Sequence, residues 1–559
     1  MDKIWLKSYP EGIPAEINPD EYSSLLDLFE ESIAKYGDKI AYENMGATLT
    51  FNELDEKSAA FAAYLQRKGL QKGDRFVIQS PNLIQYPIAI FGILRAGLIV
   101  VNTNPLYTPK EMEHQFTDSG AKGILILANF ASNLEKVIKH TSIEHVFVTE
   151  VADMVGGLKG WAMNMAVKYL KKMVPSYSIP NAVSFTDALY EGKKYNYSKP
   201  KFDSGDVAFL QYTGGTTGVS KGAMLTHRNI LANMQQLVAW VDVSDIKEGV
   251  ETGITALPLY HIFALTFNCF GFLRYGVKNV LITNPRDMEG FVEELKKHKI
   301  GLISGVNTLF NGLLNQPEFK NVDFSHLKVA LGGGMAVQEA VNNRWKEITG
   351  KAIAEAYGLT ETSPGLIVNP LAGKVRIGWI GLPLPSTEVR ILDDAGNDVE
   401  LGQPGEICGK GPQIMKGYWQ RPEETANTMI GDYFKTGDIG VMDEEGYFKI
   451  VDRKKEMILV SGFNVYPNEV EGVIALNDKV LEVGVIGIPD EKSHEAIMAC
   501  IVKKDDSLTK EEIRAFCKEH LTGYKVPKHV VFKDELPKSN VGKILRRVLK
   551  EQELGTEKV

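Results

Sequence analysis

The stretch YTGGTTGVSKGA, residues 212–223, reveals the fold class better than any other part of the sequence. It follows VAFLQY (207–212), a run of strand type, and precedes a segment whose apolar spacing predicts a helix from about Asn229. Glycines let backbone N–H groups turn toward a polyphosphate, and hydroxyl and ammonium groups can neutralise its charge. The residues that we assign to these tasks are Thr213, Gly214, Gly215, Thr216, Thr217, Gly218, Ser220 and Lys221. The segment predicts an ATP-binding loop between a strand and a helix.

The spacing of this loop differs from that of the phosphate loop of kinases and GTPases. The pattern GxxxxGK[ST] requires Ser or Thr directly after the lysine, whereas Gly222 follows Lys221. A run of Gly, Ser and Thr can also be a plain flexible loop. The three glycines, the hydroxyl-bearing and basic residues and the preceding strand favour a nucleotide site over that alternative.

On both sides of the loop, strand and helix patterns alternate. The predicted helices cover residues 53–67, 86–95 and 111–118, and the predicted strands are RFVIQS (75–80), LIVVN (98–102), GILIL (123–127), ITALPL (254–259) and LKVALGG (327–333). This alternation predicts an α/β fold with a large layered body.

The texture of the sequence changes after about residue 388. Short β runs and Gly/Asp turns, such as TEVRILDDAGNDV (387–399) and EEGYFKIVDR (444–453), predict a β-rich subdomain. Beyond Arg453 strands and helices mix on a smaller scale, including predicted helices over residues 509–520 and 543–552. We therefore expect an N-terminal domain over residues 1–452 and a small α+β domain over residues 453–559.

Composition and charge narrow the class of protein. The chain has 559 residues with a formal net charge of −8, and this acidic balance argues against nucleic acid as a partner. Its four cysteines form no CxxC pair, so neither a zinc site nor a disulfide framework is indicated, and a reducing cytosol fits. The sequence has neither a signal peptide nor a run near the ~20 apolar residues of a spanning helix. We expect a cytoplasmic protein.

Residues 158–174, LKGWAMNMAVKYLKKMV, predict an amphipathic helix. Its apolar face carries Leu158, Met165, Tyr169 and Met173, and its opposite face carries Asn164, Lys168, Lys171 and Lys172. A lysine-bearing helix of this kind can lie in a lipid headgroup layer, which would place the protein peripherally on the cytoplasmic face of a membrane. Alternatively, the stripe packs onto its own domain.

Further motifs follow the loop in a fixed order. They are LPLYHIFAL (257–265), GGGM (332–335), EAYGLTET (355–362), YFKTGDIG (433–440), VDRKKEMILVSGFNVYP (451–467) and PKSNVGKILRR (537–547). This series resembles the adenylate-forming enzymes, the superfamily of acyl-CoA synthetases, luciferases and peptide-synthetase adenylation domains. Flanking stretches such as INPDEYSSLLDLFE and NTNPLYTPKE extend the resemblance over nearly the whole chain, to bacterial long-chain fatty acyl-CoA synthetases.

The resemblance implies a reaction in which a fatty carboxylate attacks the α-phosphate of ATP and coenzyme A then takes the acyl group. It implies that Glu361 and Thr213 hold Mg²⁺, which prefers oxygen ligands, that Thr360 contacts the α-phosphate and that Lys221 neutralises charge. For the nucleoside it implies contacts from Gly333, Gly334, Met335, Glu355, Ala356, Tyr357, Gly358, Asp438 and Arg453. In this set Tyr357 stacks on adenine, and Asp438, supported by Arg453, accepts the ribose hydroxyls.

The C-terminal motifs imply a moving domain. Lys543, at the start of the predicted last helix, resembles the lysine that bridges the acyl carboxylate and the nucleotide. Lys455 matches the hinge position, about which the small domain rotates to bring Ser461, Gly462 and Phe463 toward CoA.

The acyl pocket is implied to lie at His261 and Phe263. Gly332 and Gly358 are expected to keep an acyl channel open, and Trp240 to gate it. Without their motifs, a tyrosine is usually a core residue, an aspartate a cap, and an arginine or lysine a solvated surface residue.

Several alternatives share these motifs. An aryl-CoA or medium-chain acyl-CoA ligase, a luciferase-like enzyme, a peptide-synthetase adenylation domain and a ligase that stops at the acyl-adenylate would all keep the nucleotide residues. A non-catalytic fatty-acid binding or uptake protein would keep the fold, since fold does not guarantee function, but it would be expected to lose catalytic positions. Similar enzymes are commonly homodimers.

Overall fold

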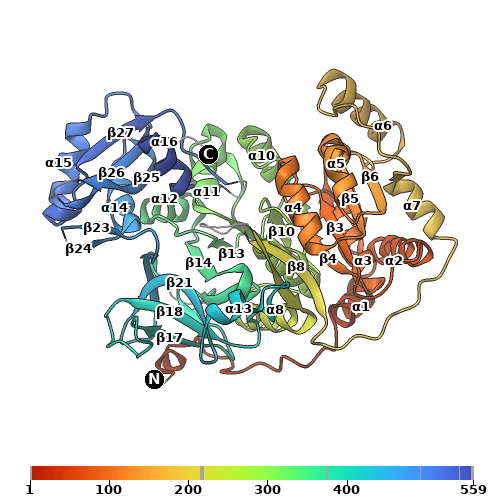
Figure 1. Ribbon diagram of the computed structural model, residues 1–559, viewed down its shortest axis with the longest axis horizontal. Coiled ribbons are helices and arrows are strands. Elements are labelled where there is room, and N and C mark those ends of the chain that lie inside the picture. Colours follow the sequence, from red (N-terminus) through yellow and green to blue (C-terminus); the bar gives the residue numbers. More distant parts are fainter. Residues whose placement is uncertain are drawn as a thin grey trace.

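The computed structural model describes residues 3–213, 220–372, 375–461, 463–490, 493–539 and 542–555. Within these ranges the strands form four sheets. Two large sheets with their helices make the body of the molecule, an antiparallel sheet lies below them, and the C-terminal lobe lies at one end (Figure 1). Gly214, Gly215, Thr216, Thr217, Gly218 and Gly462, which the sequence assigns to the phosphate loop and to CoA, lie outside the described residues.

The first large sheet carries the strand that leads into the phosphate loop. In spatial order its strands are β19 (Gly417–Tyr418), β9 (Lys221–Thr226), β8 (Val207–Thr213), β4 (Ile99–Asn102), β3 (Arg75–Gln79), β5 (Gly123–Leu127), β6 (His145–Thr149) and β7 (Val183–Ser184). Its helices are α2 (Phe51–Arg67), α3 (Gln85–Arg95), α4 (Pro109–Ser119), α5 (Ala131–Val137) and α7 (Phe185–Gly192). Phe61 of α2 meets the rings of Phe76, Phe147 and Phe185 edge-on, which fixes this helix on the sheet.

The helix predicted from about Asn229 is present and begins at His227, but a strand that was not predicted precedes it. The expected helix does not follow the loop directly, because β9 first returns antiparallel to β8, with Thr213 opposite Lys221. The helix α8 (His227–Asp242) begins only after β9, where Thr226 and Asn229 form a capping box. The loop therefore joins two paired strands.

The second large sheet packs against the first through one continuous hydrophobic core. Its strand order is β16 (Leu382–Pro383), β15 (Gly365–Val368), β14 (Ile353–Gly358), β13 (Val329–Gly333), β12 (Leu302–Gly305), β10 (Thr252–Thr255), β11 (Lys278–Leu281), β1 (Ile40–Asn44) and β2 (Ala47–Thr50). Its helices are α1 (Leu25–Tyr36), α8, α9 (Phe272–Tyr275), α10 (Met288–Leu295), α11 (Asn307–Leu314) and α12 (Glu339–Thr349), with a π-helical segment over Ala264–Gly271. The inner strands are parallel, so their carboxyl ends meet at one edge.

The β-rich subdomain is an antiparallel sheet, as the turn-rich sequence predicts. It contains β17 (Glu388–Leu392), β18 (Gly405–Lys410), β20 (Met429–Ile430), β21 (Tyr433–Met442) and β22 (Phe448–Arg453), with the short helix α13 (Pro422–Asn427). Alternate residues of β21 are buried, the pattern of a strand with one covered face.

The C-terminal lobe has its own sheet and two hydrophobic clusters. Its elements are β23 (Ile458–Val460), β24 (Phe463–Val465), α14 (Pro467–Ile474), β25 (Val480–Asp490), β26 (His494–Lys503), α15 (Lys510–His520), β27 (His529–Lys533) and α16 (Arg546–Leu554). The predicted terminal helix begins too early, because α16 starts at Arg546 and Lys543 precedes it in a loop. There the N–H of Ser539 donates to the carbonyl of Lys543 at 2.7 Å.

The amphipathic segment forms α6 (Gly157–Met165) and a π-helical turn over Ala166–Leu170, at the far end of the body from the C-terminal lobe (Figure 1). Its apolar side faces outward, with Leu158 86% and Leu170 82% exposed. Asn164, expected on the polar face, is instead buried, where it accepts the N–H of Ala152 at 2.8 Å and donates to Asp153. Packing of the apolar stripe onto its own domain is therefore the wrong alternative for this segment. None of the helices in the described ranges combines the length and the apolar character needed to cross a membrane.

Candidate active site

The predicted nucleoside side of the site is built by β14 and the β21–β22 hairpin. Tyr357 donates from its hydroxyl to Asp438 Oδ2 at 2.7 Å, and the guanidinium Nε of Arg453 lies 3.0 Å from Asp438 Oδ1. Asp438 and Arg453 are register partners across the hairpin. Burial and the Asp438 carboxylate raise the pKa of Tyr357, so its hydroxyl stays a donor. Three residues predicted from separate motifs therefore form one hydrogen-bonded group.

Glu355 lies on β14, the strand that also carries Tyr357. Its carboxylate accepts the N–H of Val337 at 3.1 Å and that of Gly378 at 3.3 Å, and burial raises its pKa to about 7. The side chain therefore fixes two turns beside the site.

The GGGM turn lies between the nucleoside side and the predicted acyl pocket. Gly334 has a φ of +77°, and a Cβ on Gly333 would approach Phe263 Cε1 to 2.9 Å. Gly332 does not face Phe263 in this way, because a Cβ there would come within 2.7 Å of Ile353 and of Val337. Its neighbours are core side chains.

The predicted phosphate and metal side lies at the 3₁₀ turn Thr360–Thr362. This turn packs against both β8 and β9 and so brings Glu361 close to the strands that end at Thr213 and begin at Lys221. Glu361 is only 8% exposed, and its Oε1 accepts a hydrogen bond from the hydroxyl of Tyr418 at 2.6 Å. Among the residues that the structure describes, its other carboxylate oxygen has no hydrogen-bond donor. A buried carboxylate with one oxygen available, on a turn that packs against the strand ending at Thr213, fits the oxygen ligands that Mg²⁺ prefers.

Lys221 is already engaged by residues that the sequence did not single out. It forms an ion pair with Glu424, and its ammonium lies 5.3 Å from the centroid of the Tyr418 ring. Glu424 and Tyr418 are about two hundred positions away in the chain. The only sequence signal near them is Pro422 at the start of a short acidic helix, and this does not reveal either contact.

The C-terminal lobe brings Lys543 to the site. The hydroxyl of Thr308 in α11 donates to the carbonyl of Gly542 at 2.9 Å, and the amide of Asn311 donates to the carbonyl of Leu481 at 3.0 Å. Burial and the Arg453 guanidinium lower the pKa of Lys543 to about 8. Lys543 therefore interacts electrostatically with Arg453 and Asp438.

His261, on the predicted acyl side, interacts electrostatically with Lys543. Its Nδ1 accepts the N–H of Phe263 at 3.3 Å, and burial, with a smaller contribution from Lys543, lowers the pKa of His261 to about 4. His261 is therefore neutral at pH 7. The helix that follows Phe263 lines a small apolar cavity with α8, bounded among others by Leu237, Val241, Phe267, Phe272, Tyr275 and Leu302.

Trp240, the expected gate, is fully buried on α8. Its indole N–H donates to the carbonyl of Asn369 at 3.1 Å. In this arrangement the ring is held within the core.

The expected hinge Lys455 lies two positions after Arg453, and the expected CoA residues follow it in the chain, from Ser461 onward. Arg546 lies 3.3 Å from Asp452 and 2.7 Å from Glu471, and it also pairs with Glu456, next to Lys455. Ser461 has a φ of +52°, and the ring of Phe463 is 56% exposed. Figure 1 places β23 and β24 on the outer side of the C-terminal lobe, away from β14.

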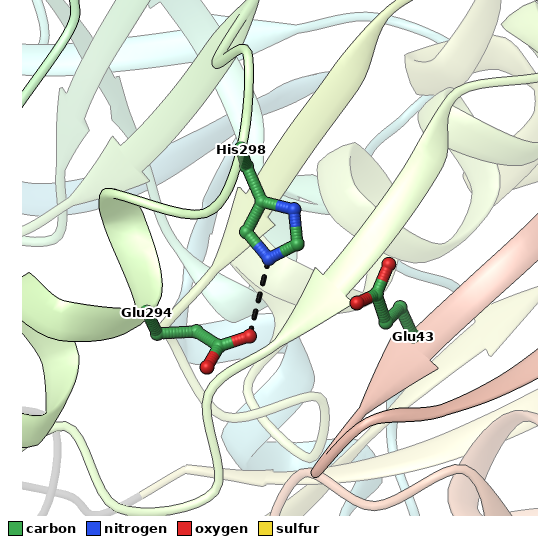
Figure 2. A group of neighbouring side chains, drawn as sticks. All are labelled: Glu43, Glu294 and His298. Atoms are coloured by element: carbon green, nitrogen blue, oxygen red, sulfur yellow. Dashed lines mark hydrogen bonds and ion pairs between the residues drawn. The ribbon is translucent and has the colours of Figure 1, made fainter.

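One further group of side chains has the composition of a metal site. Glu43, Glu294 and His298 offer ligand atoms within 4.8 Å of one another (Figure 2). His298 Nε2 lies 3.1 Å from Glu294, but the ammonium of Lys278 lies 3.1 Å from Glu43 and 3.5 Å from His298 Nδ1. This cation supplies the positive charge that a metal ion would bring, so we interpret the group as an ion-pair network.

Comparison with known proteins agrees with this geometry. Residues 29–419 match the AMP-binding enzyme family, and residues 469–543 match the AMP-binding enzyme C-terminal domain. Long-chain-fatty-acid–CoA ligases of Escherichia coli O6:H1 and Haemophilus influenzae are 56% and 54% identical to this chain, each over 99% of both sequences. The ligase of the same name from Bacillus subtilis is 39% identical over 99% of this chain and 98% of its own.

Solved structures give the same result for the fold. An anthranilate CoA ligase in complex with anthranoyl-AMP superposes with a TM-score of 0.87 at 24% identity, over 97% of this chain and 100% of its own. ATP-bound MatB from Rhodopseudomonas palustris superposes with a TM-score of 0.78 at 27% identity, over 96% and 100%. The chain belongs to the AMP-binding enzymes, which form the adenylate-forming superfamily.

Proposed function

We propose that this protein is a long-chain fatty acid–CoA ligase, which converts a fatty acid, ATP and CoA into acyl-CoA, AMP and pyrophosphate. The observation that carries the proposal is the docking of the Lys543 loop on α11, where Lys543 interacts electrostatically with Arg453, Asp438 and His261, in a chain whose full-length relatives carry that activity in their names. A non-catalytic binding protein would not be expected to keep these groups together.

In the first step, a carboxylate oxygen of the fatty acid attacks the α-phosphorus of ATP, and the bond to pyrophosphate breaks. Asp438 would accept the ribose hydroxyls, and Thr360 would contact the α-phosphate. Lys543 would lie between the acyl carboxylate and the nucleotide, where its charge stabilises the developing negative charge. Mg²⁺, when bound, would neutralise phosphate oxygens, and Glu361 and Thr213 would hold it.

In the second step, the thiol of CoA attacks the carbonyl carbon of the acyl-adenylate, and AMP leaves. We propose that residues 453–559 move as a unit about Lys455, so that Lys543 withdraws and Ser461, Gly462 and Phe463 approach the site. The arrangement in this structure would then be the adenylating one, because the Lys543 loop is docked while Phe463 faces outward.

The test supplies purified protein with Mg²⁺, ATP, CoA and carboxylic acids from acetate to oleate, with coumarate as the aryl representative. AMP, pyrophosphate and acyl-CoA are measured separately for wild type, Lys543→Ala and Glu361→Ala. We expect long-chain acyl-CoA from wild type and loss of pyrophosphate release in both variants. Pyrophosphate without thioester would indicate an adenylate-stopping ligase, preference for coumarate an aryl-CoA ligase, and no turnover a binding protein.

We further propose that the apolar side of residues 158–174 contacts an anionic membrane surface, on the cytoplasmic side, where fatty acids collect. Leu158, Trp161, Tyr169, Leu170 and Met173 are all more than half exposed. Lys159, Lys168, Lys171 and Lys172 lie in the same segment, and this combination suits an interfacial helix.

Co-sedimentation with phosphatidylglycerol vesicles tests the membrane contact. The double variant Leu158→Glu/Leu170→Glu should bind several-fold less than wild type, whereas Leu401→Glu, at an exposed leucine elsewhere, should bind equally. Equal binding of the double variant would contradict the proposal.

We also propose that the protein is a homodimer, as is common among similar enzymes. Sedimentation velocity over a range of concentrations tests this.

A further inference from the structure

Residues 415–425, which we call the brace, connect the two predicted phosphate-side residues. The N–H of Met415 donates to the carbonyl of Glu361 at 2.8 Å, and the N–H of Trp419 donates to that of Gly222 at 2.8 Å. Within the brace, β19 pairs with β9, the strand that begins at Lys221. The brace is thus bonded to both the Glu361 turn and the strand that carries Lys221.

Tyr418 is the side chain of the brace that touches both of these residues. Its hydroxyl donates to Glu361 Oε1 at 2.6 Å, and its ring lies under the Lys221 ammonium at 5.3 Å. The tyrosine itself is held in place, because it is 8% exposed and its N–H donates to Thr425 Oγ1 at 2.9 Å.

A second bonded layer anchors the brace to the strand before the loop. The Asp118 carboxylate accepts the hydroxyl of Tyr212 at 2.7 Å and the guanidinium of Arg421 at 2.7 Å. Tyr212 is the neighbour of Thr213. The brace is therefore connected to both strands that border the phosphate loop and to the turn that carries Glu361.

This arrangement restricts the Glu361 carboxylate. With one oxygen fixed by a buried phenol, the carboxylate cannot rotate freely, and its second oxygen keeps one direction. Groups that hold a metal-ligating side chain in this way commonly contribute as much as ~10–100-fold to metal affinity or activity. The ring face beneath Lys221 adds an attraction for the ammonium that does not consume its hydrogen-bond donors.

We propose that Tyr418 is a positioning residue for adenylation, which orients Glu361 for Mg²⁺ and holds Lys221 for the phosphates of ATP. It acts through these two residues and needs no contact with substrate. The inference rests on the proposed function of the site. If Tyr418 were only a packing residue, its replacement would change stability but not the dependence on Mg²⁺.

The test measures binding of a non-hydrolysable ATP analogue by calorimetry at a series of Mg²⁺ concentrations, without fatty acid or CoA. We expect Tyr418→Phe, which keeps the ring and loses the hydroxyl, to need about tenfold more Mg²⁺ for half-maximal binding. Binding without Mg²⁺ should be unchanged. Tyr22→Phe is the control, because the Tyr22 hydroxyl donates to Glu31 at 2.7 Å in a surface position outside the site.

The outcomes separate this inference from the proposed function. A wild type that shows no Mg²⁺-dependent binding of the analogue would remove the proposed function and the inference with it. If the wild type binds normally and Tyr418→Phe has the same Mg²⁺ midpoint, the inference about Tyr418 is wrong. The proposed function is then unaffected. Thermal unfolding of both tyrosine variants checks that the fold is retained, and Tyr418→Leu, which also removes the ring, should further weaken binding at saturating Mg²⁺.

Discussion

The start of β9 and the loop before α16 each bring a lysine to the proposed phosphate site, but under different conditions. Lys221 is 36% exposed and already paired with Glu424. Lys543 is partly buried, its pKa is lowered to about 8, and no ion pair of it occurs among the described residues. Glu424 therefore balances the charge of Lys221 before any ligand binds, whereas no described ion pair balances the charge of Lys543.

The difference shows how binding can be coupled to movement of the lobe. A buried charge without a partner costs free energy, so docking of Lys543 becomes more favourable when an anion enters the site. Lys221 gains less free energy from a bound phosphate, because the phosphate must first displace Glu424. We therefore expect Lys543 to contribute mainly to the rate of adenylation and Lys221 mainly to nucleotide affinity.

Replacing Lys543 gives the largest expected effect. Lys543→Ala should lower the rate of adenylation about 10²–10³-fold, the usual effect of losing a group that stabilises transition-state charge. Formation of acyl-CoA from supplied acyl-adenylate should change little, because Lys543 is not needed there. Pyrophosphate release and thioester formation are measured separately. Equal losses in both would contradict a role of Lys543 in adenylation alone.

The loop that carries Lys543 offers a second test. Gly542 has a φ of +80°, and a Cβ there would approach Thr308 Oγ1 to 2.5 Å. Gly542→Ala should therefore disturb docking, and a left-handed backbone costs a non-glycine residue about 1–2 kcal/mol. We expect adenylation to fall about 5–30-fold with thioester formation retained. Gly523→Ala, where a Cβ would meet nothing within 4 Å, is the control, and an equal loss there would contradict the prediction.

The pH dependence of adenylation follows from the lowered pKa of Lys543. Below pH 8 the ammonium is charged and active, and above pH 8 it loses its proton, so the rate should fall as pH rises. With a pKa of about 8, the rate at pH 9 should be about tenfold lower than at pH 7. Lys543→Arg keeps its charge over this range, so its slower reaction should lack the alkaline decline. If the rate of the arginine variant declined with the same midpoint, the group that titrates would be one other than Lys543.

The smallest effect is expected at Lys221. Glu424→Gln removes the competing carboxylate and should strengthen binding of Mg²⁺-ATP about two- to fivefold, because half-exposed ion pairs are worth up to about 1 kcal/mol. Calorimetry measures this, with Glu423→Gln as the neighbouring control. Weaker binding in the Glu424 variant would mean that Glu424 holds Lys221 in place and does not compete for it.

Much of the body could be predicted from the sequence because its signals are local. The run GILIL coincides with β5, and the predicted helix over residues 53–67 is α2, whose start is fixed by a capping box between Thr50 and Glu53. The predicted groups Tyr357, Asp438 and Arg453 also meet as expected. Their motifs could name them, although no spacing along the chain brings them together.

Other features could not be predicted, since they depend on contacts between distant segments. The strand β9 was missed because the residues after the loop read as a direct entry into a helix, and only pairing with β8 decides otherwise. Asn164 was placed on the outer face because an amphipathic pattern does not say which face meets the protein. Its burial is determined by hydrogen bonds to residues 152 and 153.

The α/β class, the family and the identity of most candidate site residues could be predicted from the amino-acid order alone, because they depend on local periodicity and on ordered motifs. Tertiary structure alone decided that Lys543 is docked, that Tyr418 joins Glu361 to Lys221, and that the apolar side of α6 faces outward. The physical reason is that a side chain's partners, burial and pKa are set by what the fold places around it, and in each of these cases the neighbours come from distant parts of the chain or from the packing of the whole molecule.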